Sequence, residues 1–169
     1  LTFNLDLENS QKTGFFLDQK YNRRAVRHLA QGRRVLDCFS HVGPFGLNAA
    51  AGGADFVRCV DVSQTAIDLA IQNAKLNGLL DRMDFTCANV MEYLPELAAN
   101  KSKLKAEGGP FDLIVLDPPA FTKTRSKVRS ALRGYQEINA AAMKLLPRGG
   151  YLATCSCSHF MTRDLLAQA

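Results

Sequence analysis

The sequence predicts an α/β fold with a mostly parallel sheet and helices on both faces. Short apolar runs alternate with helical segments along most of the 169 residues, which is the pattern of repeated strand–helix units. The run 111–116 is apolar except for Asp112, as expected for a strand that is covered on both faces. Glycine pairs and Asn77-Gly78 follow the helical patterns, where helices commonly end.

The elements follow in chain order, and a strand opens each unit. The expected strands are 35–39, 56–60, 83–87, 111–116 and 151–154. The expected helices are 45–51, 64–76, a third that begins at Asn89, and a fourth around 132–146. Ser63 is expected to cap the second helix, and Pro95 weakens the third because proline removes a helical hydrogen bond.

The composition is that of a globular domain in a reducing compartment. Hydrophobic residues make up 47% of the chain and charged residues 22%, which is enough apolar chain to bury a core. No apolar run has the length of a membrane span, so the sequence excludes a membrane protein. Five cysteines, an odd number, favour a cytoplasmic location over secretion. The chain begins with Leu1 and shows no signal peptide, so we expect a piece of a longer protein.

The net charge of +5 is unevenly distributed along the chain. Residues 1–34 carry 7 basic and 3 acidic side chains, and residues 101–133 carry 8 and 3. The segment between them, residues 35–100, carries 3 basic and 8 acidic side chains. One interpretation is a polyanion contacted from two sides, since phosphates favour clustered Lys and Arg. Ordinary solvated surface charge is the other interpretation.

Polar side chains lie at the carboxyl ends of the expected strands: Asp37, Asp61, Asn89, Asp117 and Cys157. Ligands of open α/β sheets bind at this edge, so these side chains are expected to face one cleft, although each alone also fits a cap or turn. Asp61 is placed to accept hydrogen bonds from ribose hydroxyls, and Asn89 to contact an adenine edge. The loop after the first strand lacks the GxGxxG pattern of a pyrophosphate cradle. The set therefore indicates an adenosine cofactor without a diphosphate, and S-adenosylmethionine fits.

Two further stretches carry candidate chemistry. The prolines of Asp117-Pro118-Pro119 fix the backbone, so the carboxylate is held rigidly for the edge of a planar substrate. A stiff strand-to-helix turn is the alternative, and Phe121 either stacks on a base or fills the core.

Cys157 is the best nucleophile candidate because it follows a strand end. Three other thiols are expected to be buried and inert: Cys38, Cys59 and Cys87. The Cys155–Cys157 spacing is poor for zinc, and we expect no metal.

Five motifs in this order are specific for a family. They are Lys12–Gln19 with Asn22-Arg23, Leu36–Ser40 with Gly43 and Phe45-Gly46, Leu116–Lys123, Arg133–Tyr135 with Glu137–Asn139, and Thr154–Ser158. With them the chain resembles the bacterial 23S ribosomal RNA (cytosine-5) methyltransferases that carry a PUA domain before the catalytic domain.

The resemblance implies a Rossmann-like class I methyltransferase fold, truncated at both ends. An amino-terminal segment 1–32, with a strand or turn plus a helix, would pack on a core 33–169 that is incomplete at its carboxyl end. The resemblance implies S-adenosylmethionine as cofactor, with Asn89 standing where the family usually has Asp. The implied cofactor-binding residues are Gln19, Asp37, Phe39, Ser40, His41, Gly43, Phe45, Asp61, Val62, Asn89, Val90 and Asp117.

The resemblance also implies a covalent mechanism on ribosomal RNA. Cys157 would add to carbon 6 of cytosine while Asp117 contacts the pyrimidine edge, and the product would be 5-methylcytosine; Cys155 is the second nucleophile candidate. Lys and Arg residues around 20–34 and 123–133 would bind the RNA. Two alternatives stay open: methylation of an exocyclic amino group of guanine or adenine, and a non-catalytic module that binds RNA or nucleotides.

Overall fold

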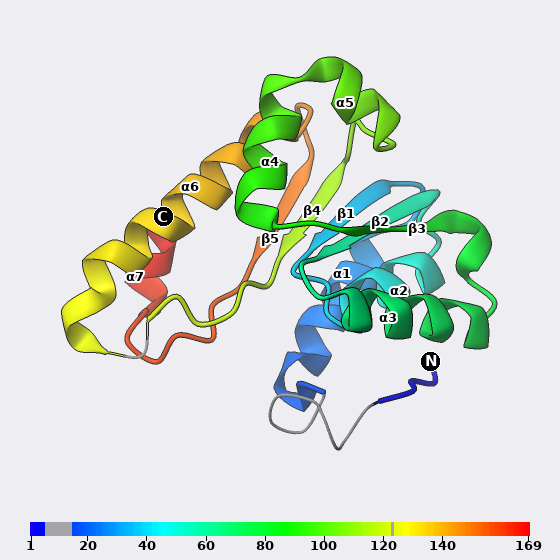
Figure 1. Cartoon of the computed structure of the whole chain (residues 1–169), viewed down its shortest axis with the longest axis horizontal. Helices are drawn as coiled ribbons and strands as arrows, with labels where there is room; N and C mark the ends of the chain where they lie inside the picture. Colours follow the sequence, from blue (N-terminus) through cyan, green and yellow to red (C-terminus); the bar gives the residue numbers. More distant parts are fainter. Residues whose placement is uncertain (6–14, 123) are drawn as a thin grey trace.

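A five-stranded parallel sheet with strand order β3-β2-β1-β4-β5 forms the centre of the computed structural model (Figure 1). The structure describes residues 1–5, 15–122 and 124–169, so Lys12–Gly14 and Lys123 of the sequence motifs lie outside the described residues. The strands are β1 (Arg34–Cys38), β2 (Phe56–Asp61), β3 (Met83–Cys87), β4 (Leu113–Leu116) and β5 (Tyr151–Thr154). Because all neighbours are parallel, the carboxyl ends of the strands meet at one edge.

Helices cover both faces of this sheet (Figure 1). Val26 of α1, Leu47 of α2 and Ala74 of α3 belong to the core on one face, and Leu94 of α4 and Ile138 of α6 to the core on the other. The helices are α1 (Lys20–Leu29), α2 (Pro44–Ala51), α3 (Gln64–Leu76), α4 (Val90–Ala99), α5 (Lys101–Ala106), α6 (Val128–Leu145) and α7 (Arg163–Ala167). Three single turns of 3-10 helix are η1 (Leu17–Gln19), η2 (Leu80–Arg82) and η3 (Arg125–Lys127).

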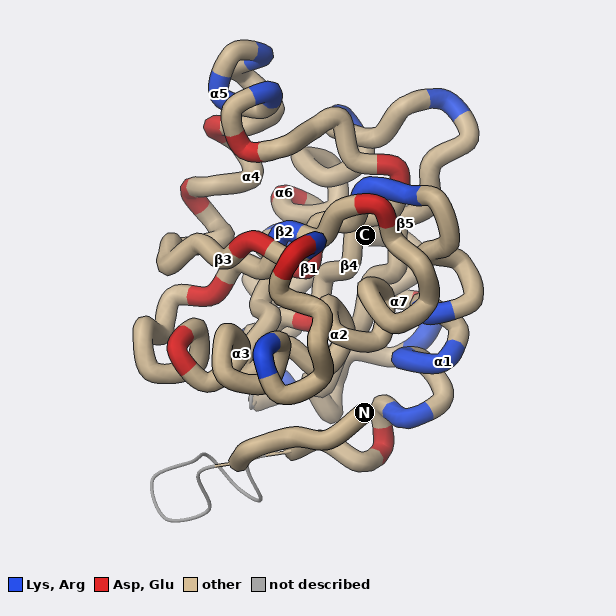
Figure 2. Tube along the Cα trace, turned by 90° about the vertical axis from the view of Figure 1, so that its right-hand side faces the viewer, with Lys and Arg blue, Asp and Glu red and all other residues tan. Residues whose placement is uncertain are grey.

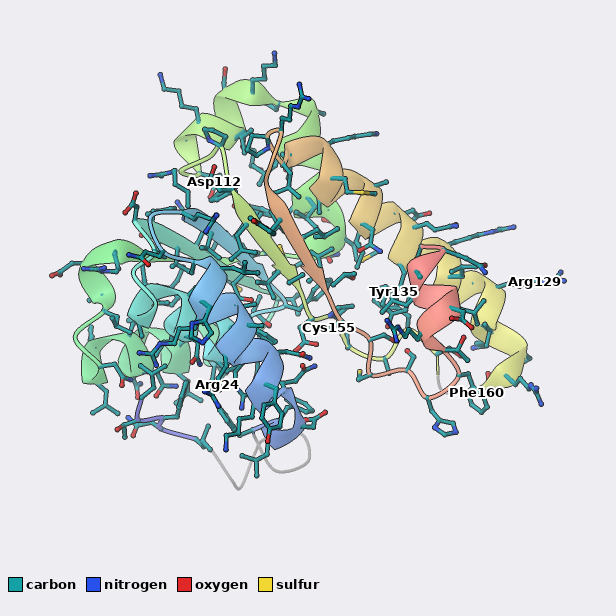
Figure 3. The ribbon with its side chains drawn as sticks, turned by 180° about the vertical axis from the view of Figure 1, so that it is seen from behind. Arg24, Asp112, Arg129, Tyr135, Cys155 and Phe160 are labelled. Carbon is teal, nitrogen blue, oxygen red and sulfur yellow. The ribbon has the colours of Figure 1, made fainter. Side chains whose placement is uncertain are left out.

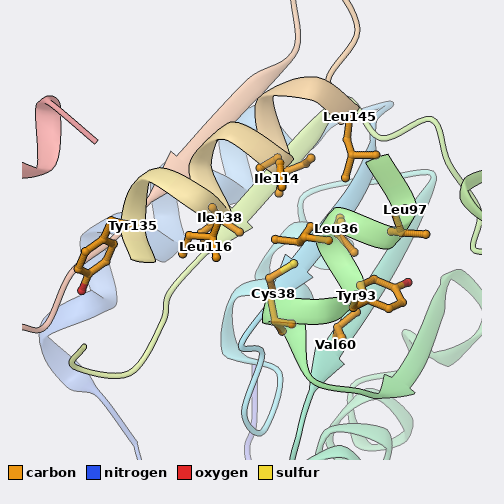
Figure 4. Close-up of a cluster of buried hydrophobic side chains, with 14 of the residues drawn as sticks. Leu36, Cys38, Val60, Tyr93, Leu97, Ile114, Leu116, Tyr135, Ile138 and Leu145 are labelled. Atoms are coloured by element: carbon orange, nitrogen blue, oxygen red, sulfur yellow. The ribbon is translucent and has the colours of Figure 1, made fainter. Parts of the chain in front are cut away.

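The central strands are apolar on both sides because each face has its own core. Successive residues of a strand point to opposite faces, so Leu36 and Ile114 enter the core under α4 and α6, and Val35 and Leu113 enter the core under α1 and α2. Figure 4 shows the core under α4 and α6. Tyr135 and Leu145 lie at opposite ends of the part of α6 that packs into this core. The predicted α/β fold with a parallel sheet and helices on both faces is confirmed.

Most element boundaries agree with the sequence to within a few residues. The helix 64–76 is observed as predicted, and Ser63 caps it by accepting a hydrogen bond from the Ala66 amide at 3.2 Å. Helix α6 begins at Val128, four residues earlier than predicted, because its polar first turn interrupts the apolar pattern. The short helices α5 and α7 were not predicted. Within the described part of the chain, no helix combines the length and hydrophobicity needed to cross a membrane.

Candidate active site

The carboxyl edge of the sheet gathers three carboxylates. Asp37 is the penultimate residue of β1, Asp61 ends β2, and Asp117 directly follows β4. Both Asp61 and Asp117 lie close enough to Asp37 for their charges to raise its pKa. The structure therefore brings together the acidic residues that the strand-end pattern singled out.

Asp37 is a buried carboxylate with one oxygen in use. It is 1% exposed, and its Oδ2 accepts a hydrogen bond from the Gly46 amide at 2.7 Å. Burial raises the pKa of Asp37 to about 8, against the opposing effect of the Gly46 N–H. Its Oδ1 is buried and has no hydrogen-bond partner among the described residues. A buried acceptor without a partner raises the free energy of the folded state, so a ligand that donates a hydrogen bond to this atom would be stabilised.

The loop after β1 is held in an uncommon backbone conformation. Phe39 and His41 have φ of 59° and 49°, in the left-handed region that side chains other than Gly rarely adopt. Gly43 also has positive φ, and a Cβ there would lie 2.5 Å from Leu47 Cδ1. The hydroxyl Oγ of Ser40 is buried without a partner among the described residues, like Asp37 Oδ1. Such strained positions cluster at ligand-binding sites.

Asp61 anchors this loop from the next strand. Its Oδ2 accepts a hydrogen bond from the His41 amide at 2.8 Å, and its Oδ1 accepts one from the Ser63 amide at 2.9 Å. Val62, the following residue, is 70% exposed. An exposed apolar side chain beside a fixed carboxylate can pack on the planar base of a nucleoside while the carboxylate binds the ribose of the same nucleoside.

Three other side chains that were predicted to bind the cofactor make contacts within the protein instead. Asn89 caps α4: its Oδ1 accepts a hydrogen bond from the Met91 amide at 3.1 Å, and its Nδ2 donates one to Glu92 Oε1 at 2.9 Å. Val90 and Phe45 are buried in the two cores, at 2% and 3% exposure. The role of Asn89 at an adenine stays a prediction, and the side chain acts as a cap in this structure.

The amino-terminal segment reaches the loop after β4. Gln19 Nε2 donates a hydrogen bond to Asp117 Oδ1 at 3.3 Å, and Asn22 Nδ2 donates one to Gln19 Oε1 at 2.6 Å. Burial raises the pKa of Asp117 to about 6, Asp18 raises it further, and Arg23 opposes both. Gln19, which the resemblance implies as a cofactor residue, therefore contacts Asp117 directly, and Asn22 contacts Gln19.

Arg23 lies near Asp117 in the candidate site, and sequence reasoning did not single it out. Its guanidinium is buried, donates a hydrogen bond to the Phe16 carbonyl at 2.7 Å, and lies 4.6 Å from the centre of the Phe15 ring. It thus holds the segment before α1 against the site. The only signal in the sequence is its place in the Gln19–Arg23 motif.

The two thiols after β5 differ in environment. Cys157 is exposed, and its Sγ lies 3.7 Å from the Pro118 carbonyl oxygen, against the loop that carries Asp117. Cys155 is half-buried; burial raises the pKa of its thiol to about 12, with Asp117 and Asp37 adding to the rise. The structure therefore places the exposed thiol beside the candidate substrate loop and keeps the inner one protonated.

Helix α6 supports both loops. The Tyr135 hydroxyl lies 2.8 Å from Ser156 Oγ and 3.3 Å from Ser158 Oγ, so it holds the segment that carries Cys157. Phe121 packs on the same tyrosine, with 4.6 Å between the ring centres. Of the two interpretations of Phe121, these contacts favour packing over base stacking.

Cys87 corrects one prediction. We expected it to be buried with Cys38 and Cys59, and those two are, but Cys87 is exposed. It ends the edge strand β3, and its Sγ lies 3.4 Å from the Val62 carbonyl oxygen. Across the described part of the chain, no group of three or more His, Cys, Asp or Glu residues is suited to hold a metal.

The charges of the chain are unevenly distributed in space. Figure 2 shows Lys and Arg concentrated on α1 and α5, and Asp and Glu near α3 and the neighbouring strands. Arg125, Lys127, Arg129 and Arg133 are exposed in η3 and α6, on the segment after Asp117. In the view of Figure 3, Cys155 lies between Arg24 on α1 and Arg129 on α6. Cations therefore lie on two sides of the loops after β4 and β5.

These features fit S-adenosylmethionine. The buried acceptors Asp37 Oδ1 and Ser40 Oγ, the fixed Asp61 carboxylate and the exposed Val62 offer partners for the ammonium group, the ribose and the adenine of this cofactor. Fold and site together define a methyltransferase that uses S-adenosylmethionine. The chain belongs to this family, because the family model described as S-adenosylmethionine-dependent methyltransferase matches residues 1–169.

Curated relatives are methyltransferases of ribosomal RNA. The chain is 46% identical over 162 residues to ribosomal RNA large subunit methyltransferase I of Aeromonas salmonicida, an alignment that covers 95% of this chain and 39% of the relative. It is 44% identical to the enzyme of the same name from Erwinia tasmaniensis, with the same coverage. The chain spans about two fifths of the length of these relatives.

Solved structures agree on the fold. SMU.776 complexed with SAH superposes with a TM-score of 0.81 at 23% identity, covering 98% of this chain and 42% of that one. TrmN from Thermus thermophilus superposes with a TM-score of 0.63 at 26% identity, covering 87% of this chain and 40% of that one. The Rossmann-like methyltransferase fold is therefore confirmed.

Proposed function

We propose that this chain is the catalytic domain of an RNA methyltransferase that forms 5-methylcytosine in large-subunit ribosomal RNA through a covalent adduct with Cys157. The observation that carries the proposal is the exposed Cys157 thiol, 3.7 Å from the Pro118 carbonyl in the loop of Asp117. The names of the relatives from Aeromonas salmonicida and Erwinia tasmaniensis support ribosomal RNA as substrate.

The cofactor end of the site is held by this chain's own residues. Asp37, Ser40 and the loop to Gly43 would bind the methionine part, Asp61 the ribose, and Val62 with Asn89 the adenine. Gln19 would close over the cofactor from the amino-terminal segment, fixed by its hydrogen bond to Asp117. When bound, S-adenosylmethionine supplies an electrophilic methyl group.

The substrate end supplies the nucleophile. The Cys157 thiolate donates an electron pair to carbon 6 of cytosine, and the π pair of the C5–C6 bond moves to carbon 5, which then becomes the nucleophile for the methyl group. That pair forms the bond to the methyl group. A base then removes the carbon-5 proton, the C5–H electron pair re-forms the C5–C6 double bond, and the C6–S bond breaks with its electron pair to release the thiolate. The raised pKa of Asp117, about 6, leaves part of it protonated near neutral pH, so it both donates and accepts hydrogen bonds at the pyrimidine edge.

Cys157 is favoured over Cys155 as the nucleophile because Cys157 is exposed and Cys155 is held protonated. A nucleophilic cysteine reacts as the thiolate, and the pKa of about 12 keeps Cys155 protonated at neutral pH. Cys155 is also half-buried, near Asp37 and Asp117, whereas Cys157 is exposed.

A trapped adduct tests the nucleophile directly. In an RNA transcript with 5-fluorocytidine, fluorine replaces the hydrogen that must leave carbon 5, so the C6–S bond is not released. We expect wild-type protein and Cys155→Ser to form an adduct with this RNA that survives denaturing electrophoresis, and Cys157→Ser to form none. An adduct that persists in Cys157→Ser and disappears in Cys155→Ser contradicts the assignment.

A second candidate is methylation of an exocyclic amino group of guanine or adenine. The observation that favours it is the Asp117 carboxylate, which Gln19 orients at the start of a rigid Pro-Pro loop where it would accept a hydrogen bond from an amino group. Cys157 would then be incidental, and Cys157→Ser would methylate RNA at the wild-type rate.

A further inference from the structure

One exposed face of α1 carries aromatic and apolar side chains among cations. Leu17 and Tyr21 are 76% and 73% exposed, among the most exposed large hydrophobic residues of the described chain. Arg24 and His28 continue the line and are also exposed. Residues three and four apart share a helix face, so Tyr21, Arg24 and His28 form one line along α1, and Leu17 lies in the η1 turn directly before the helix. These four residues are called the α1 stripe.

The charge around the α1 stripe is positive. Lys20 and Arg27 flank it on the same helix, and both are exposed. Asp18 is the only acidic residue between positions 15 and 34. Isolated exposed hydrophobic residues are common, but aromatic rings interleaved with Lys and Arg are the pattern of surfaces that bind single-stranded nucleic acid.

The opposite face of the same helix reaches the candidate active site. Gln19 hydrogen-bonds Asp117, and the buried Arg23 packs toward the site. An α-helix is about 10 Å across, so the α1 stripe lies about one helix diameter from the Asp117 loop. An RNA whose target base lies at that loop therefore has its neighbouring nucleotides within reach of the stripe.

We propose that the α1 stripe binds unpaired nucleotides that flank the target base, with a base stacked on Tyr21 and phosphates on Arg24 and its neighbours. This inference rests on the proposed RNA substrate and adds to it a binding surface and a strand preference. Stacking requires a base whose face is free, so the stripe selects single-stranded RNA over a duplex.

Binding measured without S-adenosylmethionine tests the stripe independently of catalysis. The probes are a fluorescein-labelled oligo(A) and a blunt RNA duplex of equal length, followed by fluorescence anisotropy at several salt concentrations. We expect Tyr21→Ala to weaken oligo(A) binding at least about fivefold with an unchanged salt slope, because a stacked base contributes affinity without neutralising a phosphate. Tyr21→Phe keeps the ring and is expected to bind within about twofold of wild type.

Two controls separate stacking from charge. Arg24→Ala is expected to reduce the slope of log affinity against log salt by about 0.7, the value for one lost phosphate contact on a single strand. Tyr151→Ala removes another exposed tyrosine, 41% exposed at the amino end of β5 and thus away from the carboxyl edge of the sheet, where its ring centre lies 4.9 Å from the Arg33 guanidinium. This variant is expected to bind oligo(A) like wild type.

Three results overturn the proposal: wild-type affinity of Tyr21→Ala for oligo(A), an equal loss on the duplex, or an equal loss in Tyr151→Ala. The first of these assigns the stripe to a protein partner instead. The outcomes are separate from those for Cys157: a loss in Tyr21→Ala supports the stripe even if the methylated base is not cytosine.

Discussion

Replacing Asp37 by Asn removes a titratable group from the buried carboxyl end of β1 while keeping the shape of the side chain. The amide oxygen of Asn can still accept the hydrogen bond that Gly46 donates to Asp37 Oδ2 at 2.7 Å. What changes is titration: burial raises the pKa of Asp37 to about 8 in the folded state, from an ordinary value of 3.8. Asp37→Asn therefore isolates the effect of this one proton on stability.

The sign follows from which state holds the proton more tightly. The folded state binds it up to about pH 8 and the unfolded chain only up to about pH 4, so the contribution to stability is fully present below pH 4 and is lost as the pH rises toward 8. Integrated from pH 6 to pH 9, this proton linkage lowers the free energy of unfolding of the wild type by about 3 kcal/mol. At about 2–4 °C per kcal/mol for a chain of this size, the melting temperature falls by about 6–12 °C.

Thermal denaturation followed by circular dichroism, at several pH values from 6 to 9, measures this loss. The wild type is expected to lose about 6–12 °C more than Asp37→Asn over that range, since the other titrating groups are shared by both proteins. Saturating S-adenosylmethionine is expected to raise the melting temperature of the wild type, and to raise that of Asp37→Asn much less. Parallel pH profiles of the two proteins would refute the assignment of a raised pKa to Asp37.

Three further predictions concern the cofactor edge and the basic surface. Val62→Arg is expected to weaken S-adenosylmethionine binding by about tenfold in calorimetric titration while leaving the cofactor-free melting temperature unchanged, because Val62 is 70% exposed; an unchanged Kd contradicts its place at the adenine. Gly46→Ala places a Cβ 2.4 Å from Cys59 Sγ and is expected to cost about 1–3 kcal/mol in denaturant unfolding, part of which Cys59→Ala restores; wild-type stability of Gly46→Ala contradicts the close packing. Neutralising the basic segment after Asp117 is expected to lower the salt slope of single-stranded RNA binding by about 0.7 per lost phosphate contact, and an unchanged slope makes these charges ordinary surface. That variant replaces Lys123, Arg125, Lys127 and Arg129 by Ala.

The fold was predictable because its apolar pattern is strong where burial is complete. The run that contains β4 is buried on both faces, and Ser63 with Asn77-Gly78 marks both ends of α3. The pattern was least informative where burial is partial. Val128, at the start of α6, lies in a polar turn, and Cys87 reads as a buried strand residue although its edge position leaves it exposed.

The site was predictable to the extent that topology dictates it. Parallel strands bring Asp37, Asp61 and Asp117 to one edge, and this follows from the order of strands and helices alone. The contact of Gln19 with Asp117 joins residues 98 positions apart and depends on how α1 packs, which no local pattern specifies. The difference between Cys155 and Cys157 likewise depends on burial, which the sequence spacing does not give.

The most direct test of the central claim is the identity of the nucleoside that this protein methylates. Large-subunit ribosomal RNA without the modification is incubated with protein and isotopically labelled S-adenosylmethionine, digested to nucleosides, and analysed by mass spectrometry. The account predicts labelled 5-methylcytidine with wild-type protein and with Cys155→Ser, and none with Cys157→Ser. Label in N-methylated guanosine or adenosine, at equal levels in Cys157→Ser and wild type, would contradict the account.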